Sequence, residues 1–461
     1  MCGVVGVYCE DRELTPTLVY YALYALQHRG QESAGIAVYS DGVRVYKGMG
    51  LVTEVFRENV LSKLKGKIAI GHVRYSTTGE SKSENAQPIL VRSKVGEIAI
   101  GHNGNLVNYS QLREILENEG KVFATTSDTE VIAQLLSNFL MKHDLYESLS
   151  LLTEKLLGSY TITALINDTL LAYRDPLGFR PLCIGEGDFG YVIASESCAL
   201  DTLELNKIRD IKPGEAVIIR NGDLEVVRIA RAKRCARCVF EYIYFARPDS
   251  VIDGVTVYEA RYKMGRNLAR ESAVECDIVS PVPDSGTTCA IGYSAESKIP
   301  YIEALIKNRY VGRTFIMPEQ RLRELSVRIK MNVVKKNIEG KRVTLVDDSI
   351  VRGTTSRKIV EIVRSAGAKE VHFRVGSPPI ISPCYFGIDM STREELIASC
   401  GDLEYVRRAI SADTLAYLSL KGLIKSVGFG EDELCLACLT GIYPVCVPGE
   451  LCDNAKYELN Y

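Results

Sequence analysis

The stretch 341–355, KRVTLVDDSIVRGTT, constrains the fold of this chain more than any other part of the sequence. It begins with a short, β-rich apolar run over 343–346, which two aspartates end abruptly. A loop follows in which Gly353 is free to take a positive φ, and 356–368 then places apolar residues at helical spacing. With a further strand expected over 371–375, the pattern predicts a strand–loop–helix unit of a parallel sheet, which binds ligands at the carboxyl ends of its strands.

The residue types in this loop favour a phosphorylated ligand that also carries a diol. Backbone N–H groups and the hydroxyls of Ser349, Thr354 and Thr355 can cradle a phosphate. Asp347 and Asp348 would repel a phosphate, but they can hold sugar hydroxyls or a Mg²⁺ ion that bridges to a diphosphate. We expect both acids at an exposed strand end. The alternative is a turn whose acids merely cap a helix, and the complete DDSxxRGTT pattern favours the functional interpretation.

Composition excludes several classes of protein. The chain has 461 residues, which predicts about two to three domains. Its 56 basic and 58 acidic residues give a net charge of −2, which favours neither a nucleic-acid nor a membrane partner. We find no apolar run near the roughly 20 residues of a membrane helix and no signal-like segment. The 14 scattered cysteines favour a reducing, cytoplasmic location with catalytic or metal-bound thiols over a disulfide scaffold.

The N-terminus offers a candidate nucleophile, Cys2, directly after Met1. Removal of Met1 would leave Cys2 with both a thiol and a free α-amine. The amine, whose ordinary pKa is about 8, can serve as general base for the thiol, as in N-terminal nucleophile enzymes. For Cys2 alone, a chance cysteine in a frayed terminus is the simpler alternative.

Three later motifs change that balance. GHVRYSTTGE contains Arg74, which can fork onto a carboxylate. GHNGNLVN follows a strand expected over 97–100, and its Asn103 and Gly104 offer the amide and the close backbone N–H that an oxyanion hole needs. TTSDTEV contains Asp128, which can hold an ammonium group. Singly, HNG is a turn and Asp128 a helix N-cap, but together the motifs predict a site that cleaves the amide of a free amino acid.

The second half of the chain contains another strand–turn–helix pattern, PVPDSGTTCAIGYSAES, with Asp284 and Ser285 at its tip. This turn is a candidate diphosphate loop. The segment 302–332 is dense in basic residues, among them Lys307 and Arg313. Such a run is usually a solvated face, but between two phosphate-site strands a closing lid is an equal alternative.

VTLVDDSIVRGTT resembles the phosphoribosyl diphosphate (PRPP) signature of type I phosphoribosyltransferases. The resemblance implies that Asp347 and Asp348 bind ribose and metal. The 5′-phosphate would lie on the loop that follows, formed by Ser349, Ile350, Val351, Arg352, Gly353, Thr354 and Thr355. Asp284, Ser285, Lys307 and Arg313 are further expected PRPP contacts, and Mg²⁺ is expected near Ser285, Asp347 and Asp348.

The first half resembles the class II glutamine amidotransferase domain in CGVVGV, QHRGQESAGIA, HVRYSTTG, HNGNLVN, SDTE and RDPLGFRPL. The resemblance implies an N-terminal nucleophile αββα sandwich over 2–230, with two antiparallel sheets between helices. It implies that Cys2 is the nucleophile, that Asn103 and Gly104 form the oxyanion hole, and that Arg74 and Asp128 clamp glutamine. A type I phosphoribosyltransferase domain with a parallel sheet and iron–sulfur ligands is expected over 231–461.

The block 238–440 resembles the amidophosphoribosyltransferase family, in FEYIYFARPDS, LIKNRYVGRTFI, CYFGIDMSTREELIA and CLACLTGIYP among others. The resemblance implies the first committed step of de novo purine synthesis. Glutamine would be hydrolysed at Cys2, and the ammonia would displace diphosphate from PRPP to give 5-phosphoribosylamine. Purine nucleotides are expected feedback inhibitors, and a homo-oligomer, expected to be a tetramer, is implied.

The sequence contradicts two alternatives. Another class II amidotransferase, such as a glucosamine-6-phosphate synthase, should lack the VDDSIVRGTT loop. A non-enzymatic PRPP or nucleotide sensor should carry a DNA-binding module and no Cys2.

The cysteines allow two different metal sites. The CxxC pairs 235/238 and 435/438, read alone, suggest a Cys₄ zinc site. The family resemblance instead implies a [4Fe–4S] cluster on Cys238, Cys384, Cys435 and Cys438, with Cys235 spare.

Overall fold

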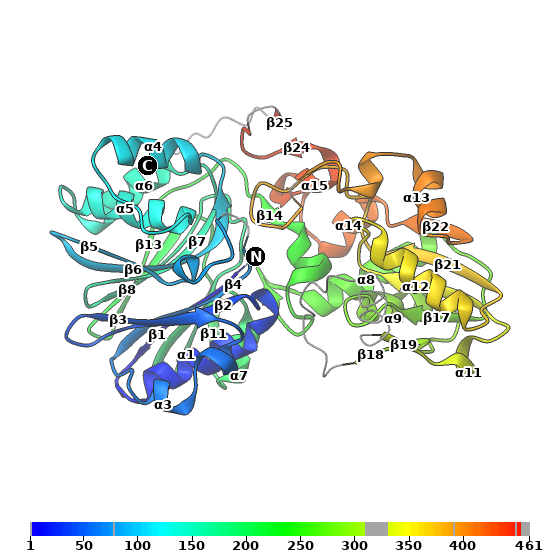
Figure 1. Ribbon diagram of the computed structural model, residues 1–461, viewed down its shortest axis with the longest axis horizontal. Helices are drawn as coiled ribbons and strands as arrows, with labels where there is room; N and C mark the ends of the chain where they lie inside the picture. Colours follow the sequence, from blue (N-terminus) through cyan, green and yellow to red (C-terminus); the bar gives the residue numbers. More distant parts are fainter. Residues whose placement is uncertain (1, 77–78, 309–330, 391, 448–449, 453–461) are drawn as a thin grey trace.

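A computed structural model describes residues 2–76, 79–308, 331–390, 392–447 and 450–452 of the chain. The first half, coloured blue to green, lies beside the second half, coloured green to red (Figure 1). Among the described helices, none combines the length and apolar character needed to cross a membrane.

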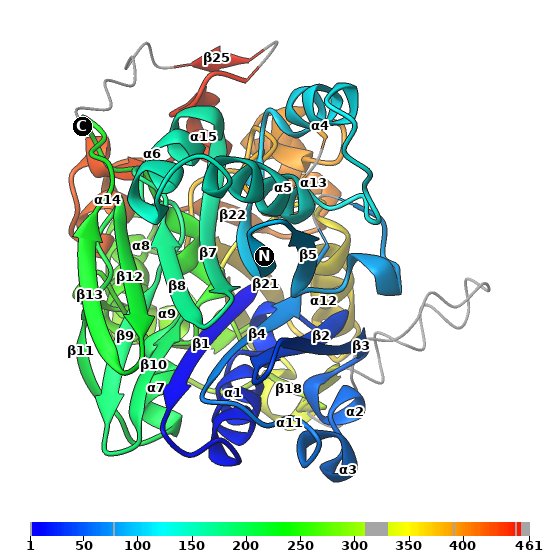
Figure 2. The ribbon, with the colours of Figure 1, turned by 90° about the vertical axis from the view of Figure 1, so that its left-hand side faces the viewer.

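Two antiparallel sheets form the centre of the first half (Figure 2). The seven-stranded sheet has the order β11-β9-β10-β1-β4-β2-β3. Its strands are β1 (Gly3–Cys9), β2 (Ser33–Tyr39), β3 (Val43–Met49), β4 (Ile68–Arg74), β9 (Cys183–Gly187), β10 (Gly190–Ala194) and β11 (Asn206–Asp210). The six-stranded sheet has the order β13-β12-β8-β7-β6-β5. Its strands are β5 (Ile89–Ser93), β6 (Gly96–Leu106), β7 (Gly158–Ile166), β8 (Thr169–Arg174), β12 (Glu215–Arg220) and β13 (Asp223–Arg228).

The two sheets face each other across an apolar core that includes Val4, Ile70 and Leu165. Helices cover the outer faces. The seven-stranded sheet is covered by α1 (Leu14–Ala25), α2 (Val52–Val55), α3 (Glu58–Leu61) and α7 (Ser197–Thr202). The six-stranded sheet is covered by α4 (Tyr109–Asn118), α5 (Asp128–Leu140) and α6 (Leu145–Lys155). This is the predicted αββα sandwich.

One strand of the sandwich is longer than predicted. The sequence places a strand over 97–100 and allows HNG to be a turn, but β6 continues through Leu106. Asn103 lies opposite Thr161 of β7, so the motif is inside the sheet. The turn alternative for HNG is wrong because strand pairing with β7, a tertiary contact, overrides the local turn preference.

A four-stranded parallel sheet organises the second half, in the order β17-β20-β21-β22. Its strands are β17 (Ile278–Pro281), β20 (Arg342–Asp347), β21 (Glu370–Val375) and β22 (Thr414–Tyr417). One face packs on α8 (Val257–Glu271) and α9 (Thr287–Ser297), the other on α12 (Thr354–Ser365) and α13 (Leu403–Ala409). The predicted strand–loop–helix unit is confirmed, with Gly353 at φ 74°.

Shorter elements complete the described chain. In the first half these are the turns η1 (Gln27–Arg29) and η2 (Ser83–Asn85). In the second half they are β14 (Arg237–Cys238), η3 (Glu241–Phe245), β15 (Val251–Ile252), β16 (Val255–Thr256), β18 (Leu305–Lys307), β19 (Met331–Val333), α11 (Lys335–Ile338), η4 (Ile397–Ser399), α14 (Leu420–Val427), η5 (Glu431–Glu433), β23 (Leu434–Cys435), α15 (Ala437–Thr440), β24 (Ile442–Tyr443) and β25 (Leu451–Cys452).

Helices α8 and α9 approach each other through glycines. A Cβ at Gly265 would lie 1.9 Å from the Cys289 carbonyl oxygen, and one at Gly292 would lie 2.1 Å from the Tyr262 carbonyl oxygen. A backbone carbonyl oxygen cannot rotate out of the way as a side chain can. No larger residue therefore fits at either position without separating the helices. This close contact fixes the position of β17 and of the turn that follows it.

We therefore expect Gly265→Ala to destabilise the second half by about 1–3 kcal/mol, because the added methyl group overpacks the helix contact. The measurement is the midpoint of thermal unfolding. Gly48→Ala is the matched control, because a Cβ there would lie 3.5 Å from Val55, an ordinary contact. Equal midpoints for the two variants would contradict the close approach of α8 and α9.

Candidate active sites

Cys2 lies just before β1 and is 7% exposed. Its backbone N donates to Asn103 Oδ1 at 3.2 Å, and its Sγ lies 3.6 Å from the Tyr75 carbonyl oxygen. The other side-chain atom of that amide, Asn103 Nδ2, is buried and has no hydrogen-bond partner among the described residues. One amide thus holds the main chain of the thiol residue and keeps a free donor beside it, which suits an oxyanion hole.

Gly104 follows this asparagine in β6 and faces β7. A Cβ at position 104 would lie 2.0 Å from the Ser159 carbonyl oxygen, so a side chain would push the strands apart. The glycine at position 104 therefore allows β6 and β7 to approach closely next to the buried amide of Asn103.

Asp128 is the first residue of α5, but it does not cap the helix. Ser127 is the N-cap and accepts from the Thr129 N–H, so the capping alternative for Asp128 is wrong. Asp128 Oδ2 accepts from the Leu106 N–H at 3.1 Å, and Oδ1 lies 3.5 Å from His102 Nδ1.

This carboxylate and its histidine form a buried charge pair. Burial opposes the charge on each group, but their mutual attraction outweighs it, raising the pKa of His102 and lowering the pKa of Asp128. The nearby Cys2 thiol adds to the shift at His102. Sequence reasoning missed His102, although it lies inside the HNG motif.

Arg74 ends β4 and is buried, as a carboxylate clamp should be, but it already has a partner. Its Nη1 forms an ion pair with Glu32, whose other oxygen accepts from the Ser76 N–H and Oγ. A ligand carboxylate would have to share or replace Glu32. Only the QHRGQES motif could have signalled this partner.

The structure corrects one expectation about the second site. Asp347 and Asp348 were expected at an exposed strand end, yet each is only 7% exposed. The reason is that the turn after β17 covers the end of β20: a Cβ at Gly286 would lie 2.3 Å from the Val346 carbonyl oxygen. Burial, and then the neighbouring Asp348, raise the pKa of Asp347 well above its ordinary value. Such a pair favours a bound proton or cation.

The loop after these acids has the predicted shape. Ser349 Oγ donates to Asp348 Oδ2 at 2.6 Å, and Ile350 is buried beneath the loop. Arg352 Nη2 donates to Glu395 Oε2 at 2.8 Å. The loop continues through Val351 and Gly353 into Thr354 and Thr355, the first two residues of α12.

The predicted diphosphate turn lies at the same edge of the sheet. Asp284 Oδ2 pairs with Lys307 Nζ at 2.7 Å, so two predicted PRPP contacts neutralise each other here. Ser285 lies next to the glycine that packs on β20. Arg313 lies outside the described residues, as does most of the predicted lid segment.

Four thiols from three segments lie in the same region of the second half: Cys238, Cys384, Cys435 and Cys438. Cys238 in β14 lies opposite Cys435 in β23. Burial raises the pKa of Cys238 to about 11, and burial with the three other thiols raises the pKa of Cys438. Across the described ranges, no three potential ligand side chains converge to metal-binding spacing. The four thiols are the right donors for an iron–sulfur cluster, but they would have to lose protons and draw closer.

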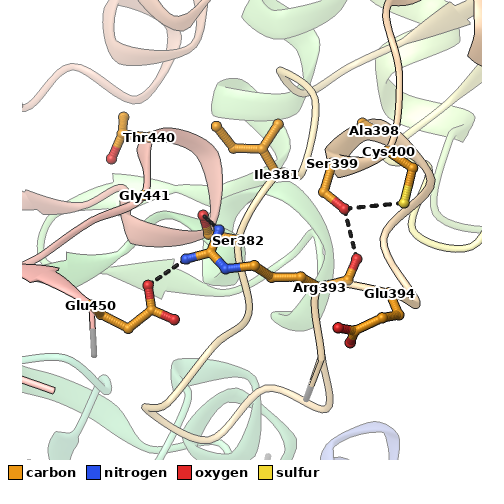
Figure 3. Close-up of a pocket in the computed structure, with 10 residues that line it drawn as sticks. All are labelled: Ile381, Ser382, Arg393, Glu394, Ala398, Ser399, Cys400, Thr440, Gly441 and Glu450. Carbon is orange, nitrogen blue, oxygen red and sulfur yellow. Dashed lines mark hydrogen bonds and ion pairs between the residues drawn. The ribbon is translucent and has the colours of Figure 1, made fainter. Parts of the chain in front are cut away.

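Cys235 is separate from these thiols. It lines a cavity of about 590 Å³ with several cationic side chains, among them Lys212 and Arg231. A second cavity, of about 730 Å³, lies beside α15 and is crossed by an ion pair between Arg393 and Glu450 (Figure 3). None of the residues predicted for either reaction lines this second cavity.

The first site is closed by the second half of the chain. Asn105 Nδ2 donates to the Tyr385 carbonyl oxygen at 3.0 Å, and Tyr75 OH donates to Asp389 Oδ2 at 3.1 Å. Gly387 packs so tightly that a Cβ there would lie 3.1 Å from the Gly104 carbonyl group. The part of β6 that carries Gly104 is therefore covered by protein rather than by solvent.

Comparison with known proteins agrees with these features. A glutamine amidotransferase domain family matches residues 72–202. An amidophosphoribosyltransferase of Archaeoglobus fulgidus is 64% identical over 456 residues, 98% of this chain and 100% of that protein. One from Bacillus subtilis is 51% identical over 453 residues, 96% of this chain and 94% of that protein. A solved structure of the B. subtilis glutamine PRPP amidotransferase, complexed with ADP and GMP, matches with a TM-score of 0.90 and 49% identity, covering 97% of this chain and 98% of that one.

The antiparallel sandwich, with Cys2 at the start of its central strand β1 and a parallel-sheet domain attached, defines a class II glutamine amidotransferase joined to a second domain. The identities over nearly the full length are more specific. The chain belongs to the amidophosphoribosyltransferase family of purine synthesis. Another class II amidotransferase and a non-enzymatic sensor are not favoured.

Proposed function

We propose that this chain cleaves glutamine at Cys2 and uses the ammonia to displace diphosphate from PRPP at the end of β20. The observation that carries the proposal is that one chain holds both sets of groups, with the segment 385–389 of the second half closing the first site. We place the boundary between the two catalytic domains at residue 230, in the short stretch between β13 and β14.

In the glutamine reaction, Cys2 Sγ attacks the side-chain amide carbon. Once Met1 is removed, the Cys2 nitrogen becomes an α-amine that already points at Asn103 Oδ1 and can take the thiol proton. Asn103 Nδ2 and the Gly104 N–H stabilise the oxyanion. Asp128 binds the α-ammonium group and Arg74 the α-carboxylate. The thioester formed with release of ammonia is then hydrolysed.

In the transferase reaction, the loop 349–355 binds the 5′-phosphate, and Asp347 and Asp348 bind the ribose hydroxyls. A divalent cation such as Mg²⁺ would be held by these acids with Ser285 and would neutralise the leaving diphosphate. Asp284, Lys307 and Arg313 are further PRPP contacts in this proposal. Ammonia attacks C1 of PRPP as the bond between C1 and the diphosphate breaks, and C1 carries oxocarbenium character.

The remaining expectations belong to the same proposal. The four thiols at 238, 384, 435 and 438 would hold a [4Fe–4S] cluster, which when bound cross-links three segments of the second domain. Purine nucleotides would act as inhibitors, and the B. subtilis relative solved with ADP and GMP supports this. We propose a cytoplasmic homo-oligomer, expected to be a tetramer.

The first test separates the two half-reactions. Cys2→Ala should lower glutamine-dependent synthesis more than about a thousandfold, because no nucleophile remains. Synthesis from ammonia at high pH should survive within about twofold, because the second site is intact. Both rates are read from diphosphate release. Cys9→Ala, which removes the buried thiol at the far end of β1, is the control. Equal loss of both activities in Cys2→Ala would show that Cys2 is structural.

The second test addresses the buried acids. Asp347→Asn and Asp348→Asn should each abolish PRPP turnover with either nitrogen source. The raised pKa of Asp347 means that the folded state binds the proton more tightly, so stability falls as pH rises above about 4. Asp347→Asn removes this pH-dependent loss of stability. At pH 8 without Mg²⁺, the thermal unfolding midpoint of the variant should therefore be no lower than that of the parent.

The control for this test is Asp277→Asn. Asp277 directly precedes β17, so it lies at the end of the parallel sheet opposite to Asp347 and Asp348. It pairs with Arg342 at 3.1 Å. It should keep both activities. Unchanged turnover in Asp347→Asn or Asp348→Asn would remove that residue from the site.

The third test addresses the thiols. Cys384→Ser should remove iron and visible absorption from anaerobically purified protein and lower its unfolding midpoint, because a Cys₄ cluster ties distant segments together. Cys235→Ser should leave iron content and midpoint unchanged. If Cys235 proves essential and Cys384 dispensable, zinc at the two CxxC pairs becomes the better interpretation.

A further inference from the structure

A buried arginine connects Cys2 to the second half of the chain. Arg29, in η1, is 0% exposed, and its Nε donates to the Cys2 carbonyl oxygen at 2.9 Å. Its Nη1 and Nη2 donate to the two oxygens of Glu241 at 2.9 and 2.7 Å. A single planar guanidinium therefore holds the main chain of the nucleophile and forks onto a carboxylate of the other domain.

A second buried acid, Glu196, also pairs with Arg29. Glu196 accepts from Arg29 Nη1, and also from the Arg247 N–H at 2.9 Å and from Ser250 Oγ at 2.6 Å. Burial raises the pKa of Glu196, but His28 and Arg29 outweigh it and hold that pKa below its ordinary value. Glu196 therefore stays ionised. Arg29 lies between Glu196, which contacts the second half, and Glu241, which belongs to it.

The position of Glu241 is set within the second half. Glu241 begins η3, and Arg261 of α8 donates to the carbonyl oxygens on this turn: Nε to Tyr242 and Nη2 to Ala246, each at 2.8 Å. Arg261 is itself buried. Any movement of α8 relative to the sandwich therefore moves Glu241 and the guanidinium paired with it.

Cys2 has few other restraints. Its nitrogen donates to Asn103, its carbonyl oxygen accepts from Arg29, and its Sγ lies 3.6 Å from the Tyr75 carbonyl oxygen. The first two contacts fix the main chain from which the thiol projects. Displacing a reacting group by about 1 Å can cost about a hundredfold in rate. The carbonyl contact leads through one side chain, that of Arg29, to Glu241 of the other domain.

We propose that Arg29 and Glu241 are positioning residues for the glutamine reaction, through which the second domain sets the orientation of Cys2. The inference rests on the proposed role of Cys2 as nucleophile. It assigns the pair no part in PRPP chemistry, so the ammonia-dependent reaction should not need it.

The test compares Glu241→Gln and Arg29→Lys in the full-length chain. Glu241→Gln keeps the shape but turns a carboxylate oxygen into an N–H group that cannot accept from Arg29. Arg29→Lys keeps the charge but loses the fork and the Nε contact. Each variant should lower kcat for glutamine-dependent synthesis by about 10- to 100-fold, the effect of losing charge-assisted hydrogen bonds. KM for glutamine and ammonia-dependent kcat should stay within about threefold.

The matched control is Asp253→Asn. Asp253 also forms a buried, two-pronged ion pair across the same boundary, with Arg174 Nη1 and Nη2 each at 2.8 Å, but it does not touch Cys2. It should lower the unfolding midpoint without changing the ratio of glutamine- to ammonia-dependent kcat. A second readout, the rate of Cys2 alkylation by iodoacetamide, should change in Glu241→Gln and Arg29→Lys but not in Asp253→Asn.

The outcomes are distinguishable. If Glu241→Gln and Arg29→Lys change the activity ratio no more than Asp253→Asn does, or if they lower both activities equally, the pair is merely structural. If one variant does not fold, the other decides. If Cys2→Ala retained glutamine-dependent synthesis, the nucleophile assignment would fail, and this inference with it. Dependence on Cys2 with an unchanged ratio in Glu241→Gln overturns the positioning role alone.

Discussion

The buried charges around Arg29 are the constraint on which the rest of the structure depends. Arg29, Arg180, Glu196 and Glu241 are each at most 2% exposed, and the two cations balance the two anions. Taking such groups out of water costs several kcal/mol per ion unless each meets a partner with good geometry. Arg29 and Arg180 come from the first half and Glu241 from the second, so neither half alone can satisfy them. The boundary between the domains is therefore specified by electrostatics as well as by apolar packing.

That boundary also covers the candidate site around Cys2. The segment 385–389 covers the part of β6 that carries Asn103 and Gly104, and Arg180 donates to the Phe386 carbonyl oxygen inside the same segment. A closed site excludes water, which strengthens the hydrogen bonds to a developing oxyanion and limits the escape of ammonia. Packing between domains and chemistry at Cys2 thus use the same residues. The small size of Gly104 and Gly387 allows the two backbones to meet there.

The sequence predicts the local features of this structure and misses the contacts between distant residues. The unit from β20 to α12 follows from an apolar run, a glycine at a positive-φ position and helical spacing, all within one short stretch. The ion pair between Arg29 and Glu241 joins residues 212 positions apart and leaves no periodic signal. Burial of Asp347 was missed for the same reason, since the turn that covers it comes from β17. The sequence predicts that the strand ends before HNG, because the pairing of this motif with β7 is likewise non-local.

The two candidate sites differ in their charge balance, and this difference bears on the order in which they bind their ligands. Around Cys2 the charged groups are already paired: Arg29 with Glu241, His102 with Asp128 and Arg74 with Glu32. At the end of β20, Asp347 and Asp348 share a buried position, and the pKa of Asp347 is raised in part because its neighbour repels its charge. The charges around the first site are balanced without a ligand, whereas the second site gains stability only when a proton or cation arrives. A cation brought with PRPP would relieve that repulsion, so binding at the second site should tighten the domain that carries Glu241, on which the geometry of the first site rests.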